Sequence, residues 1–200
     1  MADVRAPRRL SREARREQLV DAAMPVVADQ GLAEFSLETV AARADVTRNL
    51  LYHYFPRGRP DIAIAVVDRA GHELTAGWVT SDSLPLPERL AANFRRMSAH
   101  AFAPTDAWRV HRRARTADQP ELGEITERYV ETVISSVSLN HLGTRTPPPL
   151  VHLALTGFLA FAETALDEAR ETNAPPAKVM RLLSDTLVAT IRAARTASSR

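Results

Sequence analysis

The sequence predicts an all-helical protein with an N-terminal helix-turn-helix module followed by a C-terminal helical bundle. Apolar residues recur at helical spacing along most of the chain, and no run alternates between apolar and polar residues as a half-buried strand would. Glycine is scarce, with 7 residues in 200, so few positions interrupt these helical patterns. Hydrophobic residues make up 45% of the chain, which is enough for a full core in one large domain or two small ones.

The first helix is expected from about Ser11 to Gln30. Ser11 can cap its N-terminus and Gly31 can end it, since glycine accepts the backbone conformation that follows a helix. Pro25 lies inside the pattern and has no N–H to donate, so we expect a kink or local unravelling there. The apolar face consists of Leu19, Ala22, Ala23, Val26 and Val27.

Two short helices are expected next, from Leu37 to Ala44 and from Thr47 to Phe55. One apolar stripe runs along the first helix and continues across the turn. Ser36 and Thr47 can cap the two helices by accepting hydrogen bonds from backbone N–H groups one turn ahead. Asp45 stands where the turn needs a positive φ, which aspartate tolerates better than most residues.

The second of these helices carries the candidate DNA-reading face. Leu51 and Phe55 are four residues apart and should face the core. Arginine suits a guanine edge and asparagine an adenine edge, while tyrosine, histidine and threonine more often fix phosphates. A generic amphipathic helical hairpin has the same apolar spacing, so the pattern alone leaves DNA reading open. The polar residues expected to face outward are Arg48, Asn49, Tyr52 and His53.

The run from Leu37 to Phe55, ending in Leu51-Tyr52-His53-Tyr54-Phe55, resembles the DNA-binding signature of the TetR family of bacterial transcriptional regulators. The resemblance is strong over residues 12–62 and architectural beyond them. Asp45 replaces the usual glycine of the turn, and Asn49-Leu50 replaces small residues, so the operator sequence stays open. The DNA contacts that the resemblance implies are Ser36, Thr47, Arg48, Asn49, Tyr52, His53 and Arg59.

The resemblance also implies a division of the chain. We expect a helix-turn-helix DNA-binding domain at residues 11–58 and an effector-binding and dimerisation domain at 59–200. Residues 1–10 are expected to form a flexible basic arm, because the first 16 residues hold six arginines and two acidic residues. The arm is either a solvated tail or a contact to phosphates or the minor groove.

A helix from Pro60 to about residue 79 should connect the two modules, with a loop at residues 80–87 after it. Further helices are expected at about 88–102, 105–116 and 120–142. Aromatic residues in this part either pack an ordinary core or line a cavity, and TetR regulators typically bind a small effector here. The effector contacts that this suggests are Trp78, Phe94, Met97, Phe102, Trp108 and Tyr129.

A basic cluster consists of Arg109, Arg112, Arg113 and Arg115, three of which share one helix face. Three interpretations stay open for it: a solvated surface, a site for an anionic effector, or ion pairing to the DNA-binding module.

The last two helices follow the three prolines at 147–149. The region 150–166 is apolar nearly all round, so it must be buried on more than one side, and a second subunit can supply one of them. Glu163 within it is either paired in the core or an effector contact, and His152 is expected at a packing or interface position. The expected dimer interface is Leu153, Ala154, Gly157, Phe161, Leu183, Leu187 and Ile191.

Catalysis finds little support. Cysteine is absent, the glycines form no phosphate-binding loop or nucleophile elbow, and the six histidines show no metal-binding spacing, so we expect no catalytic residue, metal or cofactor. The charge-free apolar stretch at 150–162 is too short to span a bilayer, and no signal peptide is visible, so we expect a soluble cytoplasmic protein and no membrane partner.

The function expected is therefore a ligand-responsive transcriptional regulator. By the family's usual behaviour it should be a repressor that binds a palindromic double-stranded DNA operator as a homodimer. A small-molecule effector of unknown identity would release it. The alternatives are a helical scaffold that has lost operator binding, suggested by Asp45 and Leu50, and an enzyme.

Overall fold

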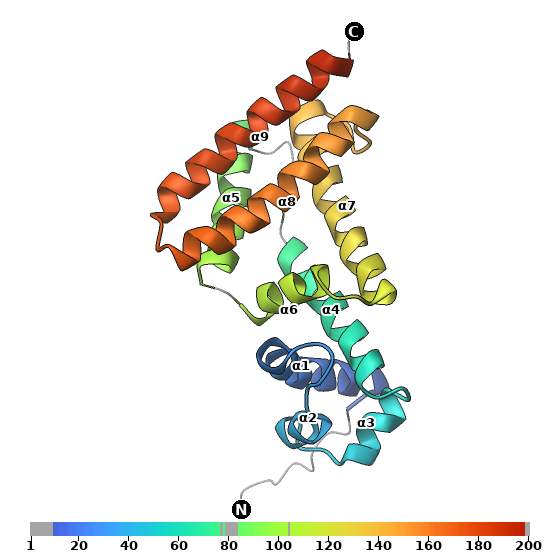
Figure 1. The fold of residues 1–200 in the computed structure, drawn as a ribbon. Coiled ribbons are helices and arrows are strands. Elements are labelled where there is room, and N and C mark those ends of the chain that lie inside the picture. Colours follow the sequence, from blue (N-terminus) through green and yellow to red (C-terminus); the bar gives the residue numbers. More distant parts are fainter. Residues whose placement is uncertain (1–9, 77, 79–83, 104, 199–200) are drawn as a thin grey trace, which may run out of the picture.

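The computed structural model describes residues 10–76, 78, 84–103 and 105–198. The predicted basic arm, apart from Leu10, and residues 80–83 of the predicted loop at 80–87 lie outside these residues. The described part is helical and contains no strand. Figure 1 shows α1 to α3 gathered at one end of the molecule and α5, α7, α8 and α9 at the other, with α4 and α6 between them. The helices are α1 (Arg12–Gln30), α2 (Leu37–Arg43), α3 (Arg48–Tyr54), α4 (Arg59–Thr75), α5 (Leu86–Phe102), α6 (Asp106–Arg115), α7 (Pro120–Leu142), α8 (Pro149–Glu171) and α9 (Pro176–Ser198).

The caps of the first three helices are those that the sequence predicts. Ser11 Oγ accepts from the backbone N–H of Ala14 at 3.1 Å, and Gly31 ends α1 with a φ of 97°. Helix α1 continues through Pro25 without unravelling. The residues on both sides of Pro25 are buried, so their packing holds the helix together where one backbone hydrogen bond is missing.

The turn between α2 and α3 depends on Asp45, whose φ of 53° is in the left-handed region. The backbone N–H of Val46 donates to Ala41 O across the turn at 3.0 Å. Aspartate accepts this conformation at modest cost, so the turn closes without the usual glycine. Asp45 is one of the two residues that suggested a helical scaffold without operator binding. Its conformation here is compatible with an intact helix-turn-helix.

Helix α4 joins the small N-terminal core to the rest of the molecule. Gly58 precedes it with a φ of 70°, and Pro60 lies in its first turn, where a missing N–H costs nothing. Its buried face packs against α1, α6 and α7. One continuous hydrophobic core therefore includes residues from α1 to α4, α6 and the first half of α7.

Helices α8 and α9 form an antiparallel hairpin that turns at Asn173, whose φ is 52°. A second core joins this hairpin to α5 and the distal part of α7. Helix α8 is long and apolar enough to cross a membrane. Core helices of soluble proteins meet the same criterion. Only 28% of the apolar window of α8 is buried, which indicates that one of its faces has no cover within the protomer.

The structure differs from the expected dimer face on α9. Leu183, Leu187 and Ile191 are at most 5% exposed and belong to the second core. They are core residues of the protomer because this stripe of α9 packs against α8 and α5. The large apolar side chains of α9 that are exposed are instead Leu182 and Val188.

Candidate DNA-binding surface and effector cavity

The exposed face of α3 presents the polar residues that the sequence assigns to it. Thr47 Oγ1 accepts from the N–H of Leu50 at 3.4 Å and starts the helix. Leu51 and Phe55 are 1% exposed and anchor α3 in the small core. Residues three and four apart share one face of a helix, so the face of α3 opposite to Leu51 and Phe55 is turned to solvent. Exposed on it are Thr47, Arg48, Asn49, Tyr52 and His53.

Arg48, at the start of α3, is held by two neighbours. Its Nη2 donates to Tyr52 Oη at 3.2 Å, and its guanidinium carbon lies 5.6 Å from the centre of the Tyr52 ring. Its Nη1 forms an ion pair with Glu38 Oε1 on α2. The hydrogen bond with Tyr52 and the charge of Glu38 raise the pKa of Arg48, which therefore stays charged. The role of Glu38 is not visible in the sequence, because its partner lies on another helix.

Ser36 and Arg59 occupy the edge of this surface. Ser36 Oγ accepts from the backbone N–H of Thr39 at 3.1 Å and caps α2 as predicted. Arg59 Nε donates to the carbonyl oxygen of Phe35 at 2.7 Å, which ties the first turn of α4 to the chain segment before α2. Arg59 thus has a structural contact besides the DNA contact that the resemblance implies.

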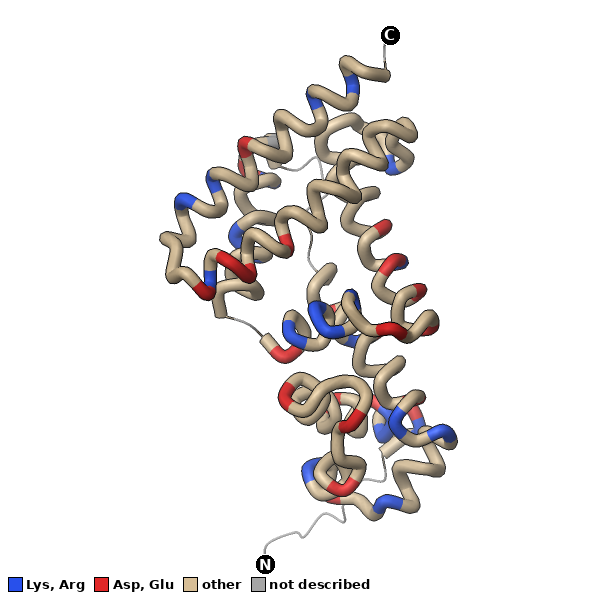
Figure 2. The backbone as a smooth tube through the Cα atoms, in the orientation of Figure 1, with Lys and Arg blue, Asp and Glu red and all other residues tan. Residues whose placement is uncertain are grey.

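Figure 2 shows basic and acidic residues side by side on the end of the molecule formed by α2 and α3. This end is not a uniformly basic patch. Sequence-specific contacts would have to come from individual side chains, since charge alone does not select a site there.

A cavity of about 80 Å³ lies in the second module between α4, α5, α6, α7 and α8. Of the six expected effector contacts, four line it: Trp78, Met97, Trp108 and Tyr129. Phe94 lines a smaller cavity of about 30 Å³ that shares Trp78 and Met97 with the first, and Phe102 lines neither. The wall is apolar apart from Thr75, His100, Tyr129, His111 and Glu163. The cavity is thus an apolar, aromatic space with few polar groups.

Glu163 lines this cavity and is paired, which confirms the first of the two interpretations from the sequence. Its Oε1 lies 3.2 Å from His111 Nε2, and its Oε2 lies 2.6 Å from Arg112 Nη1 and 3.5 Å from Arg115 Nε. Burial acts to raise the pKa of Glu163, but the hydrogen bond and charge of His111 and the charges of Arg115 and Arg112 outweigh it, and the pKa is lowered. The carboxylate is therefore ionised at neutral pH.

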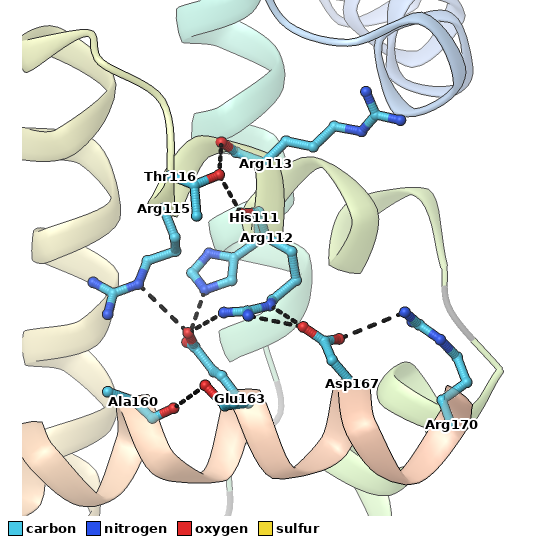
Figure 3. A network of polar contacts seen from close by, with 10 residues as sticks. His111, Arg112, Arg113, Arg115, Thr116, Ala160, Glu163, Asp167 and Arg170 are labelled. Carbon is cyan, nitrogen blue, oxygen red and sulfur yellow. Dashed lines mark hydrogen bonds and ion pairs between the residues drawn. The ribbon is translucent and has the colours of Figure 1, made fainter. Parts of the chain in front are cut away.

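The contacts continue along α8, as Figure 3 shows. Arg112 Nε donates to Asp167 Oδ2 at 2.8 Å, and Arg170 lies 3.7 Å from the other oxygen of Asp167. We call His111, Arg112, Arg115, Glu163, Asp167 and Arg170 the α6–α8 clasp. The clasp holds α6 against α8 beside the cavity, and its basic and acidic side chains form ion pairs with one another.

The remaining arginines of α6 point the other way. Arg109 Nη1 donates to Asp29 Oδ1 at 2.7 Å, and Arg113 Nη2 donates to the carbonyl oxygen of Asp29 at 3.4 Å. Asp29 lies in the last turn of α1, so α6 contacts the DNA-binding module directly. In Figure 3 Arg113 extends away from the clasp, toward α1. Among the three interpretations of the basic cluster, the structure thus shows ion pairing, both within the second module and to the first.

A second connection joins the cavity to α4. Tyr129 lines the cavity, and its Oη donates to Asp68 Oδ1 on α4 at 2.9 Å. Burial, and then the hydrogen bond and charge of Asp68, raise the pKa of Tyr129 to about 12, so its hydroxyl keeps its proton. Tyr129 was predicted from the sequence, but its partner Asp68 was not, because it lies 61 residues away along the chain.

Comparisons with known proteins agree with this geometry. Residues 19–66 match the family model described as bacterial regulatory proteins, tetR family. No curated protein sequence matches the chain significantly. The fold is similar to that of a tetR-family transcriptional regulator from Streptomyces coelicolor, with a TM-score of 0.71, 21% identity, and coverage of 94% of this chain and 90% of that chain.

Two further solved structures have the same fold. A TetR-like transcriptional regulator from Rhodococcus sp. RHA1 has a TM-score of 0.65 and 20% identity, with 90% of this chain and 96% of that chain covered. The transcriptional regulator FadR from Bacillus subtilis, in complex with stearoyl-CoA, has a TM-score of 0.61 and 14% identity, with 88% and 97% covered.

The matched segment contains α2, α3 and most of α1, with the start of α4, which is the part that carries the candidate DNA-binding surface. The matching family model and the solved structures named above are described as regulatory proteins or transcriptional regulators. The segment 19–66 is thus similar to the bacterial regulatory proteins of the tetR family, and 94% of the chain is covered by the fold of a tetR-family transcriptional regulator.

Proposed function

We propose that the protein is a ligand-responsive repressor that binds a palindromic operator as a homodimer and leaves it when a small molecule fills the cavity. The observation that carries the DNA-binding part is the exposed polar face of α3 within the segment matched to the family. Arg48 and Asn49 are the side chains suited to base edges, while Thr47, Tyr52 and His53 suit phosphates. Such a regulator would act in the cytoplasm, where bacterial DNA is found.

The dimer part rests on the uncovered apolar face of α8 and α9. Leu153 is 67% exposed, Phe161 44% and Leu182 55%. Large apolar side chains exposed in one region mark an interaction surface. A shallow groove between the two helices, lined by Leu150, Leu153 and Ala154 of α8 and by small residues of α9, offers a complementary shape. A two-fold dimer would place two copies of α3 about 34–36 Å apart, one turn of DNA, and so read an inverted repeat.

The effector part rests on the cavity. Its aromatic walls suit an apolar molecule, and the fold relative from Bacillus subtilis was crystallised in complex with stearoyl-CoA. A volume of about 80 Å³ is small for a drug-sized ligand, so binding would have to part the helices around it. Outward movement of α6 would act on α1 through Arg109 and Asp29. Outward movement of α7 would act on α4 through Tyr129 and Asp68, and α4 shares a core with the DNA-binding module.

The test is selection of duplexes from a random pool by the purified protein, followed by footprinting on the enriched sequence. The proposal expects an inverted repeat whose half-sites are about one helical turn apart, with a two-fold symmetric footprint. Affinity should fall steeply with salt, because phosphate contacts release counterions. A pool without enrichment, in the absence and presence of candidate effectors, would overturn the proposal.

A further inference from the structure

The surface expected to face DNA carries a carboxylate in contact with the first residue of the reading helix. Glu38 lies on α2 with its side chain 62% exposed, and it is ion-paired with Arg48, whose side chain is 52% exposed. A hydrogen bond from its own backbone N–H and the charge of Arg48 lower the pKa of Glu38, so it is negatively charged at neutral pH. DNA is a polyanion, and a negative charge at this position opposes its approach.

The contacts of Glu38 involve three of the expected DNA contacts at once. One carboxylate oxygen holds Arg48, while the other accepts from Ser36 Oγ at 3.4 Å. Arg48 in turn donates to Tyr52. The guanidinium thereby lies between α2 and the Tyr52 ring, with polar contacts on both sides.

This arrangement affects two kinds of DNA differently. On non-cognate DNA a free arginine would bind any nearby phosphate, so an Arg48 held and neutralised by Glu38 contributes little to such binding. On the operator a correctly placed guanidinium gains a bidentate contact to a guanine edge, and a fixed side chain loses less entropy in making it. The ion pair should therefore weaken non-cognate binding more than operator binding.

From these contacts we infer that Glu38 is a specificity-determining residue, which positions Arg48 and suppresses its binding to non-cognate phosphates. This inference rests on the proposed DNA-binding function. It goes beyond that function because it assigns a role to a residue that need not contact DNA.

The experiment compares wild type with Glu38→Gln, using the selected duplex and a scrambled duplex of the same composition at several salt concentrations. In the variant we expect the affinity for the scrambled duplex to rise about fivefold, while affinity for the selected duplex changes by less than about twofold. The slope of log affinity against log salt for the scrambled duplex should steepen by about 0.9, as one added phosphate contact would produce.

The matched control is Glu34→Gln, which removes the same charge from an exposed residue of the same module. An equal gain in that variant would show that only net charge matters and would overturn the inference. If the ratio of the affinities for the selected and the scrambled duplex is unchanged in Glu38→Gln, the inference is also overturned. Exposed ion pairs contribute little to stability, so the melting temperature of Glu38→Gln should stay close to that of wild type.

A double-mutant cycle shows whether Glu38 acts through Arg48. In an Arg48→Ala background, Glu38→Gln should no longer raise the affinity for the scrambled duplex. If the gain persists, Glu38 acts as an independent repulsive charge, and the positioning role is wrong. A wild-type protein that does not prefer the selected duplex would instead refute the proposed function itself, so the two failures are distinguishable.

Discussion

The ring of Tyr129 lies directly against Gly71, where α7 crosses α4. A Cβ atom at Gly71 would lie 2.2 Å from Cδ2 of the ring, closer than such atoms ever approach. One turn earlier along α4, Asp68 accepts the hydrogen bond from Tyr129 Oη. A cavity-lining residue thus packs on α4 through both its ring and its hydroxyl, and only a glycine at position 71 permits this approach.

Gly71→Ala should therefore destabilise the protein, although alanine favours helices more than glycine does. Overpacking of this kind typically costs about 1–3 kcal/mol in the free energy of unfolding, to be measured by urea denaturation. The control is Gly123→Ala in α7, where a Cβ atom would have no neighbour within 4 Å, and this change should be neutral or slightly stabilising. Equal stability of the two variants would contradict the close packing.

The α6–α8 clasp should make stability depend on pH through Glu163. Its pKa in the folded protein lies below its ordinary value of 4.5, so the folded state binds fewer protons than the unfolded state as pH falls through this region. The contribution of Glu163 to the free energy of unfolding is therefore complete above about pH 5. It is lost as the pH falls through the lowered pKa.

Replacement by Glu163→Gln should remove this contribution at neutral pH. Breaking a largely buried ion pair costs about 3 kcal/mol, because Arg115 loses its acidic partner and Arg112 keeps only Asp167. The difference in free energy of unfolding between wild type and variant should shrink as pH is lowered from 6 toward 3. A difference that is independent of pH over this range would show that the carboxylate charge does not act as described.

Arg109→Ala should loosen the last turn of α1. Its ion pair with Asp29 connects α6 to that turn. We expect amide hydrogen exchange at residues 28–31 to accelerate by up to about fivefold, since partly exposed pairs contribute at most about 1 kcal/mol. Arg192→Ala on the exposed side of α9 serves as control. Unchanged exchange in Arg109→Ala would mean that the contact does not hold α1.

Leu153→Asp should disrupt the proposed dimer. The side chain is the most exposed large apolar residue of α8, and a carboxylate buried between subunits would lose its hydration. Sedimentation equilibrium should show a dissociation constant raised by at least about tenfold. Leu84→Asp replaces another exposed leucine, before α5, and should leave the association unchanged. A dimer of undiminished affinity in Leu153→Asp would place the interface elsewhere.

The features that the sequence predicted correctly depend on local chemistry. Caps at Ser36 and Thr47 and the positive φ of Asp45 follow from the conformational preferences of a few adjacent residues. Helical spacing likewise indicated Leu51 and Phe55 as core residues of the small module. Such patterns can be read without knowing what the helix packs against.

The features that it missed depend on tertiary partners. Spacing showed an apolar stripe on α9 but not that α8 and α5 of the same protomer would cover Leu183. The basic cluster on α6 did not reveal that its members would separate, with Arg112 toward Glu163, 51 residues away, and Arg109 toward Asp29, 80 residues away. A charge pattern on one helix does not identify the acidic residues that will face it.

The most direct test of the central claim, that α3 reads an operator, is the affinity of Arg48→Ala for the selected duplex, measured beside wild type and Arg192→Ala. If Arg48 contacts a base, the affinity should fall by about tenfold to a hundredfold, and discrimination should relax at one base pair of each half-site. Arg192→Ala should bind like wild type. An Arg48→Ala variant with wild-type affinity and wild-type base preference would contradict the assignment of α3 as the reading helix.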